Sequence, residues 1–515
     1  MEKRAFLAVA LSVIVLILYQ IVFVKPKLEQ QKLIEPTQNE AIENKSVVEK
    51  KEPTTTKIDV TPKISANEKI LKVETPLYRA EFSTKGANIR SFVIKEYKDA
   101  NGELTSLLKT PVNIPPMSIG QTKKFEFSSA LFNTDSENIT IDKDNIKTLE
   151  FTFESNGVII KRTYKFYGNS YKIDLKDELK GIDEYFIALG SGFGYSGNEG
   201  SSRAHIGPVI LEEFNKRDIN PQKDLDSPKF YKDNIKWAAQ EDMYFFAAIV
   251  PITGIKEAIA YKENDDGLVA LRSDSKINEY VIYAGPKKQE LLKVLNLSLE
   301  NIIDFGFFSI IAKPIFWLLQ SINHYIGNYG WSIIALTLIL RVPFIPLINK
   351  GQSSMKKLQK LQPIMNDIKE KYKKDPQRMQ KEMMELYKKN KVNPMGGCLP
   401  ILIQIPVFFA LYKVLLVAIE LRGAPFIFWI VDLSAKDPYY VLPIIMGATM
   451  FIQQKLTPTG MDPKQAKIML AMPIVFTFMF LNFSSGLVLY WLCSNLLSIF
   501  QQLFVNKKVD QKALS

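Results

Sequence analysis

Arg341 lies inside a stretch of sequence that is otherwise apolar enough to cross a lipid bilayer. The stretch runs from Tyr329 to Asn349. At about 1.5 Å per helical residue, Arg341 would lie about 12 Å inside the nearer membrane edge. A guanidinium at that depth costs roughly 2.5–3.5 kcal/mol, so it should face water or a polar partner. We therefore predict a hydrated cavity inside the membrane; the alternative is that Arg341 reaches a lipid headgroup as a passive anchor.

Six apolar segments predict six membrane spans. The first is residues 1–24, where Lys3 and Arg4 precede an apolar run that is too long for most signal peptides and lacks a small-residue cleavage site. It is therefore expected to remain as an anchor. The other predicted spans are Tyr329–Asn349, Leu399–Ile419, Tyr439–Leu456, Ile468–Asn482 and Gly486–Val505. Residues 305–327 contain Lys313 and Pro314, and are expected to form an interfacial helix on the outer surface.

The distribution of positive charge predicts the orientation of these spans. Residues 350–391 contain twelve Lys and one Arg against five acidic residues, a net charge of +8 out of +12 for the chain. The positive-inside rule places this loop in the cytoplasm, and both chain termini with it. The predicted fold class is thus a polytopic α-helical membrane protein with six transmembrane helices, both termini cytoplasmic, and a large exported domain between helices 1 and 2.

The exported part begins with a linker, residues 25–66, that has no aromatic residue and no glycine and cannot bury a core. Residues 67–285 consist of short segments of alternating polarity separated by Gly, Asn, Asp and Pro, which predicts a large antiparallel β-sandwich. A helix over 287–299 should open the connecting region 286–328. The membrane core of five helices would then cover 329–505, and 506–515 would form a short basic cytoplasmic tail.

No catalytic or metal site is predicted in the exported domain. Residues 192–197 match G-x-G-x-x-G, but Asn-Glu-Gly-Ser-Ser follows instead of a helix, so we interpret the match as a flexible loop. His205 is the only histidine between residues 67 and 285, and no cysteine or paired-histidine spacing accompanies it.

The basic loop, residues 350–395, carries two amphipathic patterns. Apolar residues recur at helical spacing from Leu358 to Tyr372, and Asp375-Pro376 then provides an N-cap and a first-turn proline for a second helix. Together they predict an antiparallel helical hairpin. Its lysines could serve solvation and topology alone, or they could dock ribosomal RNA, anionic lipid or acidic segments of a substrate.

Other polar residues accompany Arg341 in the predicted spans. A single Thr or Ser in a membrane helix usually bonds its own backbone, but several polar groups near one arginine favour a wet recess. The third and fifth spans are otherwise rich in Phe and Met, which suit varied apolar partners, although ordinary helix packing explains most of them. The groove residues predicted here are Arg341, Thr337, Gln404, Tyr490 and Ser494, with Thr477 and Asn495 as further polar positions, and the apolar slide is Phe408, Met472, Phe476 and Met479.

Four segments of the chain carry a resemblance to a known family. They are residues 330–341, 391–412, 432–451 and 485–502, with sequences such as NPMGGCLPILIQIPVFFALY and SGLVLYWLCSNLLSIFQQ. They closely resemble the YidC/Oxa family of membrane insertases, and the anchor followed by a β-rich domain looks like the Gram-negative YidC form. The resemblance implies a galactose-mutarotase-like supersandwich for the exported domain. It also implies a groove arginine at Arg341, a substrate-contacting threonine at Thr337, and an aromatic pair at Tyr490 and Trp491.

The function implied by the resemblance is insertion and folding of membrane proteins in the bacterial inner membrane, alone or beside the Sec translocon. The implied partners are nascent membrane proteins, the Sec translocon, anionic lipids and, through the basic hairpin, the ribosome; the short tail weakens that last contact. No cofactor and no enzymatic activity are expected. Two alternatives are a secondary transporter, which should show repeated halves and a deep carboxylate, and a membrane-anchored periplasmic carbohydrate-binding module.

The topology yields a direct test. The substitutions Lys360→Cys and Lys388→Cys each introduce a single cysteine into a chain without Cys398 and Cys493. Impermeant thiol reagents added outside intact spheroplasts should not label these cysteines. Outward placement would leave the +8 loop on the wrong side of the membrane. Ready labelling from outside, compared with labelling after lysis, would contradict the six-span topology.

Overall fold

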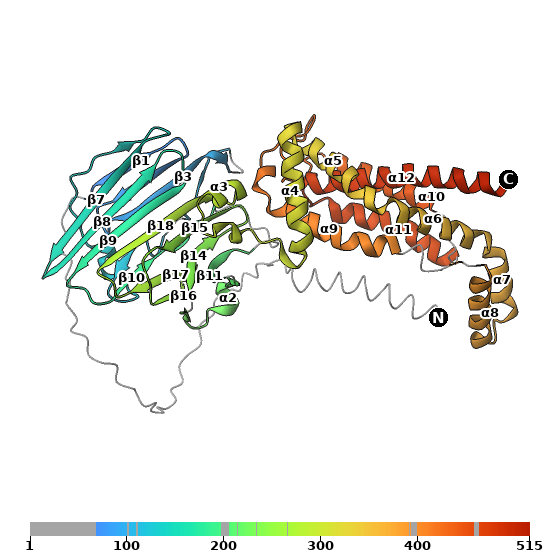
Figure 1. Ribbon diagram of the computed structural model, residues 1–515, viewed down its shortest axis with the longest axis horizontal. Helices are drawn as coiled ribbons and strands as arrows, with labels where there is room; N and C mark the ends of the chain where they lie inside the picture. Colours follow the sequence, from blue (N-terminus) through green and yellow to red (C-terminus); the bar gives the residue numbers. More distant parts are fainter. Residues whose placement is uncertain are drawn as a thin grey trace, which may run out of the picture. The chain divides into compact units, whose positions relative to one another are not determined.

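The computed structural model describes residues 68–99, 102–109, 112–196, 205–213, 215–232, 234–264, 266–390, 392, 399–457 and 463–514. The predicted anchor and linker, residues 1–66, lie outside this part. The described chain divides into two compact units, one ending at Pro286 together with residues 295–299, and the other formed by 287–294 and the residues from 300 onward. Figure 1 shows the strands in the first unit and long helices in the second.

The first unit is built almost entirely from three β-sheets. One sheet has the order β4-β3-β2-β1-β6, a second β13-β16-β17-β10-β5, and the largest β12-β11-β14-β15-β18-β9-β8-β7. The printed strand pairs are antiparallel except β1 with β6. The strands are β1 (Ile70–Glu74), β2 (Tyr78–Ser83), β3 (Asn88–Lys98), β4 (Leu104–Ser106), β5 (Ile119–Gly120), β6 (Ile139–Thr140), β7 (Ile146–Ser155), β8 (Val158–Tyr167), β9 (Lys172–Lys180), β10 (Tyr185–Ala188), β11 (Gly207–Glu212), β12 (Asn215–Asp218), β13 (Lys229–Tyr231), β14 (Ile235–Glu241), β15 (Phe245–Pro251), β16 (Glu257–Glu263), β17 (Asp266–Ser273) and β18 (Ile277–Pro286).

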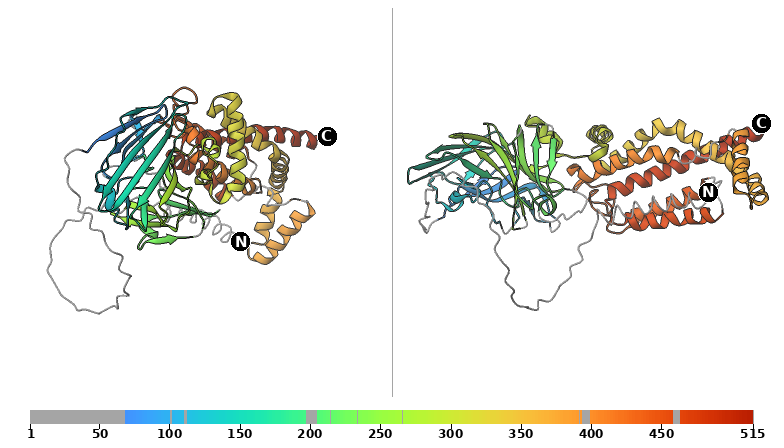
Figure 2. Two further views of the ribbon diagram at one scale, coloured as in Figure 1. Left: turned by 60° about the vertical axis from the view of Figure 1, so that its left-hand side comes forward. Right: turned by 90° about the horizontal axis from the view of Figure 1, so that it is seen from below.

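The core of this unit lies between the layers visible in Figures 1 and 2. Strand β8 alternates buried and partly exposed residues, as expected when one face packs inward. Its Tyr164 contacts Phe82 of β2 across the layers, with ring centroids 4.9 Å apart. At the other half, Phe186 of β10 joins a buried cluster with Ile259 of β16 and Leu268 of β17. The predicted all-β domain is therefore confirmed.

One loop of the first unit differs from the prediction. The segment 192–197 was expected to be a flexible loop, but of its described part residues 192–195 are buried and Ser196 is half-buried. Both glycines have positive φ, and a Cβ on Gly194 would lie 2.4 Å from the backbone nitrogen of Ala247. These glycines therefore serve close backbone packing, and Gly197 lies outside the described residues.

A buried ion pair lies inside the first unit. Arg162 of β8 and Asp177 of β9 face each other in register, and both side chains are fully buried. The guanidinium donates to both Asp177 carboxylate oxygens at 2.8 and 3.2 Å and to the carbonyl oxygen of Met117 at 2.7 Å, while the Tyr185 hydroxyl donates to Asp177 at 2.8 Å. Burial alone would lower the pKa of Arg162, but the Asp177 carboxylate outweighs it and raises that pKa.

The second unit is helical. Its elements are α3 (Gln289–Val294), α4 (Ser309–Ile326), α5 (Tyr329–Arg341), α6 (Ile345–Lys360), α7 (Gln362–Lys371), α8 (Pro376–Lys389), α9 (Leu399–Val417), α10 (Val441–Leu456), α11 (Pro463–Phe480) and α12 (Ser485–Leu514), with short 3-10 turns at 299–302, 306–308, 342–344 and 419–421. The side chain of Asn328 caps α5 by accepting from the Trp331 amide. Gly327, with φ of 70°, ends α4.

Two helix boundaries correct the sequence prediction. The helix expected over 287–299 ends at Val294, because Asn296 and Ser298 adopt positive φ. The chain expected as a separate tail after residue 505 continues α12 to Leu514.

The span expected as one helix from Tyr329 to Asn349 is interrupted directly after Arg341. A 3-10 turn of Val342–Phe344 separates α5 from α6. Pro343 has no amide hydrogen and crowds the preceding turn, which explains the break. Within the described residues, the helical stretches long and apolar enough to cross a membrane are Tyr329–Lys360 and Ser485–Phe504; Gln404–Val417, Val441–Leu456 and Met469–Phe480 are shorter apolar helices.

The basic loop forms the predicted helical hairpin, with one difference. The side chain of Asp375 accepts from the Arg378 amide and caps α8, as the Asp-Pro pair indicates. Leu358 and Met365 are buried against Met383, Leu386 and Tyr387 of α8. The first arm is not one helix, however, because it breaks at Leu361, two residues before Pro363.

The Arg162–Asp177 pair gives a stability prediction. Asp177→Ala should destabilise the first unit by roughly 3–5 kcal/mol because a fully buried guanidinium would lose its counter-charge. Lys176→Ala, on the same strand, removes only an exposed ion pair with Glu178 and should leave the unfolding temperature almost unchanged. Thermal unfolding of the full chain in detergent, followed by the β-sheet signal in circular dichroism, measures both. Equal losses would contradict a structural role for the buried pair.

Candidate functional site

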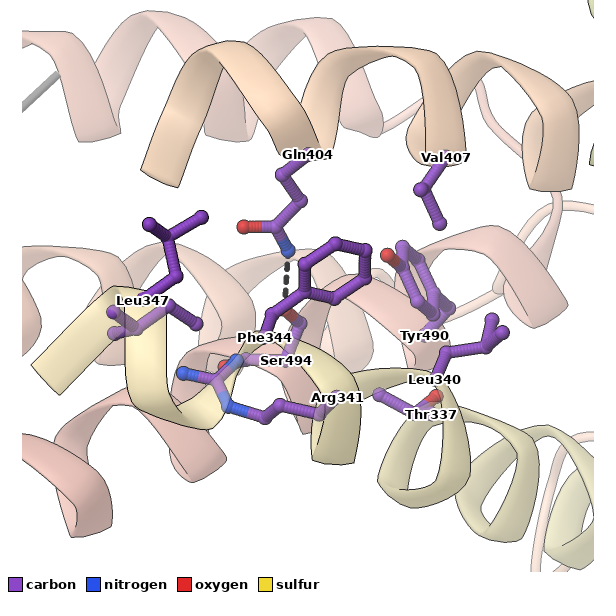
Figure 3. A pocket seen from close by; sticks show the side chains of 10 residues that line it. Thr337, Leu340, Arg341, Phe344, Leu347, Gln404, Val407, Tyr490 and Ser494 are labelled. Atoms are coloured by element: carbon purple, nitrogen blue, oxygen red, sulfur yellow. Dashed lines mark hydrogen bonds between the residues drawn. The ribbon is translucent and has the colours of Figure 1, made fainter. Parts of the chain in front are cut away.

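A recess in the second unit gathers residues from four helices and one 3-10 turn. Its empty volume, open solvent included, is about 470 Å³. Figure 3 shows Arg341 of α5 and Gln404 of α9 approaching it from opposite sides, with Ser494 of α12 between them. Its lining residues are Thr337, Leu340, Arg341, Phe344, Leu347, Ile348, Gln404, Val407, Tyr490 and Ser494. Five of the six predicted groove residues therefore surround one recess.

Neutral acceptors hold the guanidinium of Arg341, which is half-buried. Its Nη2 donates to the Ser498 hydroxyl at 2.8 Å and to Oε1 of Gln501 at 3.1 Å, and its Nε donates to the same Oε1 at 3.3 Å. Its Nη1 donates to the carbonyl oxygen of Ser494 at 3.2 Å. No carboxylate pairs with Arg341 in the part of the chain that the structure describes. The positive charge is thus oriented by dipoles and not cancelled.

The other recess residues have simpler roles. Thr337 is buried, and its hydroxyl donates to the carbonyl oxygen of Ile333 one turn earlier at 2.6 Å. Gln404 donates to the Ser494 hydroxyl at 3.2 Å and so links α9 to α12 across the recess. Tyr490 is buried at the recess wall. Apolar side chains such as Leu347 and Val407 complete the lining, so the recess combines one cation with a mostly apolar wall.

Two further polar positions lie away from the recess. Thr477 donates to the carbonyl oxygen of Pro473 in its own helix at 2.7 Å. Asn495 is buried and points to α10, where its amide nitrogen lies 3.4 Å from the hydroxyl of Thr449. These two residues are therefore explained by helix packing.

Trp491 does not share the recess with Tyr490. As its neighbour on α12, it faces a different direction and packs into an aromatic cluster. Its ring centroid lies 4.8 Å from Phe408 of α9, 5.1 Å from Phe480 and 6.2 Å from Phe476 of α11. The expected aromatic pair is thus divided: Tyr490 belongs to the polar recess, and Trp491 joins α9 to α11 on the apolar side.

The predicted slide residues follow the same apolar side. Phe408 and Phe476 both contact Trp491. Met472, Phe476 and Met479 are spaced four and three residues apart, so they share one face of α11, and each is half-buried. Ile474, Val475 and Phe478 on the same helix are exposed.

Three polar residues of the site were not anticipated. Ser498 and Gln501 continue the spacing of Tyr490 and Ser494 along one face of α12, at intervals of four, four and three residues. That polar stripe was readable in the sequence. Asn349, whose side-chain oxygen accepts from Gln501 at 2.7 Å, gave no such signal because it lies beyond the break after Arg341.

One group in the first unit has the composition of a metal site. Ligand atoms of His205, Asp218 and Glu241 lie within 4.8 Å of one another. The Lys216 ammonium, however, lies 3.2 Å from a carboxylate oxygen of both Asp218 and Glu241. A cation is therefore already supplied by the chain, and His205 Nε2 lies 3.1 Å from the carbonyl oxygen of Pro208.

Comparison with known proteins places the whole chain in one family. Residues 70–318 match the family described as YidC periplasmic domain, and residues 321–512 match the family described as 60Kd inner membrane protein. The membrane protein insertase YidC of Geotalea daltonii is 41% identical over 537 residues, which cover 99% of this chain and 100% of the relative. This chain belongs to the YidC family of membrane protein insertases.

Further relatives agree in name and extent. The membrane protein insertase YidC of Syntrophus aciditrophicus is 38% identical, covering 99% of this chain and 100% of the relative. Among solved structures, an active YidC insertase with its first transmembrane domain resolved is 20% identical, with a TM-score of 0.41, and covers 86% of this chain and 94% of that one. A galactose mutarotase related enzyme from Lactobacillus acidophilus is 10% identical, with a TM-score of 0.27, and the match covers 42% of this chain and 97% of that enzyme's chain. By family, the chain is thus a membrane insertase with a periplasmic domain, and not an enzyme.

Proposed function

We propose that this insertase receives substrates in the recess beside Arg341, from a position open to the cytoplasm and to lipid. The observation that carries the proposal is the guanidinium held by Ser494, Ser498 and Gln501 without a carboxylate. A cation that keeps its net charge among apolar walls attracts acidic residues of a short segment that must cross the membrane. The attraction offsets part of the desolvation of those residues.

The apolar part of the substrate would leave by a second surface. Met472, Phe476 and Met479 of α11, with Phe408 of α9, form a soft surface of flexible and aromatic side chains that accepts many apolar sequences. A substrate helix can move along it into lipid while its polar end occupies the recess. The membrane potential adds about 2.3 kcal/mol per charge per 100 mV for an acidic segment moving outward.

The orientation of the chain belongs to the same proposal. With six spans and both termini inside, the hairpin of α7 and α8 lies in the cytoplasm and the β-domain lies in the periplasm. The bacterial inner membrane then lies between them. The lysine-rich hairpin is then available to anionic lipids and to the ribosome. The family resemblance further implies that the protein inserts some substrates together with the Sec translocon.

The charge of Arg341 can be tested with three substitutions. Arg341→Lys should retain much activity, Arg341→Ala should impair insertion, and Arg341→Glu should impair it further. A charge pair near 4 Å is worth about 4 kcal/mol at an effective dielectric constant of 20, so even a third of that changes a rate roughly tenfold. The measurement compares insertion of one short substrate in an acidic and a neutralised version.

The acidic substrate should suffer most, because only its side chains gain from the positive site. Equal loss for both versions in all three variants would exclude charge attraction. Failure of Lys as severe as that of Ala would indicate instead that the guanidinium is a structural fork, which an ammonium cannot reproduce.

Removal of the β-domain provides an independent test. The residues that line the recess all belong to the second unit. A chain without residues 68–285 should therefore insert substrates at close to the normal rate. Gel filtration in detergent controls for folding of the remaining chain. Complete loss of insertion by a correctly folded deletion variant would move the essential function into the β-domain.

A further inference from the structure

We propose that Gln501 is a positioning residue that fixes the guanidinium of Arg341 at the wall of the recess while leaving its charge uncompensated. This inference rests on the proposed role of Arg341 in substrate attraction. Gln501 itself lies outside the recess lining, one turn beyond Ser498 on α12. It would therefore act on substrates only through Arg341.

The contacts of Gln501 determine the orientation of its side-chain amide. Its Oε1 accepts from both Nε and Nη2 of Arg341 at 3.3 and 3.1 Å. A guanidinium has only donors, so the amide must present its oxygen on this side. Its Nε2 donates to Oδ1 of Asn349 at 2.7 Å and to the carbonyl oxygen of Ile345 at 3.3 Å. Backbone carbonyls only accept, so the nitrogen must face α6.

The same amide therefore connects three helices at the break in the chain. Arg341 is the last residue of α5, and Ile345 is the first residue of α6. The 3-10 turn of Val342–Phe344 lies between them, and Pro343 in this turn cannot donate a backbone hydrogen bond. From α12, Gln501 makes two hydrogen bonds to each side of the 3-10 turn. Loss of this amide would remove two of the four hydrogen bonds of the guanidinium together with both bonds to α6.

A neutral amide differs from a carboxylate in one decisive respect. Glu at position 501 could accept the same two hydrogen bonds from Arg341, but it would cancel the positive charge and form an ion pair. Glutamine orients the guanidinium through a dipole and keeps the net charge available. Arg341 makes four hydrogen bonds with its five N–H groups. One N–H on Nη1 thus has no acceptor among the described residues and remains for a substrate carboxylate.

The test measures the ratio of insertion rates for the acidic and neutralised versions of one substrate. Gln501→Glu should reduce this ratio to the value found for Arg341→Ala, because both variants remove the net charge. Gln501→Ala should lower the ratio to an intermediate value, since the charge remains but moves. The matched control is Gln359→Glu, which adds the same charge at an exposed position of α6 and should leave the ratio unchanged.

A second measurement does not depend on insertion. Phenylglyoxal modifies accessible guanidinium groups, and mass spectrometry of the full chain in lipid nanodiscs reports the rate at Arg341. Gln501→Ala removes two hydrogen bonds to a charged group and should accelerate modification about tenfold or more. The unchanged chain and Gln359→Glu should react at the same slow rate.

The outcomes separate the two proposals. If Arg341→Ala leaves the acidic-to-neutral ratio unchanged, charge attraction itself fails. If Arg341→Ala lowers the ratio but Gln501→Glu does not, the positioning role of Gln501 is wrong while charge attraction stands. Equal phenylglyoxal rates in the unchanged chain and in Gln501→Ala would also overturn the positioning role, even if Gln501→Ala reduced insertion by general destabilisation.

Discussion

The membrane unit depends on how the positive charge of Arg341 is held inside an apolar segment. Arg341 ends α5 inside an apolar segment, and the cost of that position is met by hydrogen bonds that the guanidinium donates to neutral groups of α12 and not by an ion pair. Because the acceptors come from Ser494, Ser498 and Gln501, α12 must present a polar stripe toward α5 along about two turns. On another face of α12, Trp491 is directed to α9 and α11. The acceptors of one half-buried cation thus lie on the face of the last helix that meets the recess.

The two units treat buried charge in opposite ways. In the β-domain, Arg162 is fully buried and donates two hydrogen bonds to the carboxylate of Asp177. The negative charge of Asp177 therefore neutralises the positive charge of Arg162. Arg341 is only half-buried, lines an open recess and lacks such a partner among the described residues. A neutralised ion pair stabilises one fold, whereas an uncompensated charge favours binding of a charged substrate or ligand. The comparison of these two arginines supports a structural role for the first unit and a functional one for the second.

Much of this arrangement could be predicted from the sequence because it follows local rules. Alternating polarity located the strands, and Asp375-Pro376 located the start of α8. The sequence could not predict which way individual side chains point in the folded protein. Tyr490 and Trp491 are adjacent aromatic residues, but consecutive residues of a helix point about 100° apart around its axis. Tyr490 therefore faces the recess, and Trp491 faces the aromatic cluster. The break after Arg341 was readable from Pro343, but its consequence, the approach of Asn349 to Gln501, required the fold.

The position of the break explains why a single amide matters so much. A continuous helix would carry Arg341 and Asn349 rigidly, two turns apart, and its own backbone would fix their separation. The 3-10 turn at Val342–Phe344 changes the backbone hydrogen bonding directly after Arg341. Gln501 of α12 links the two sides of this turn, since its side chain accepts from Arg341 and donates to Asn349 and Ile345. The wall of the recess is therefore defined by contacts between helices as well as by the backbone of α5 and α6.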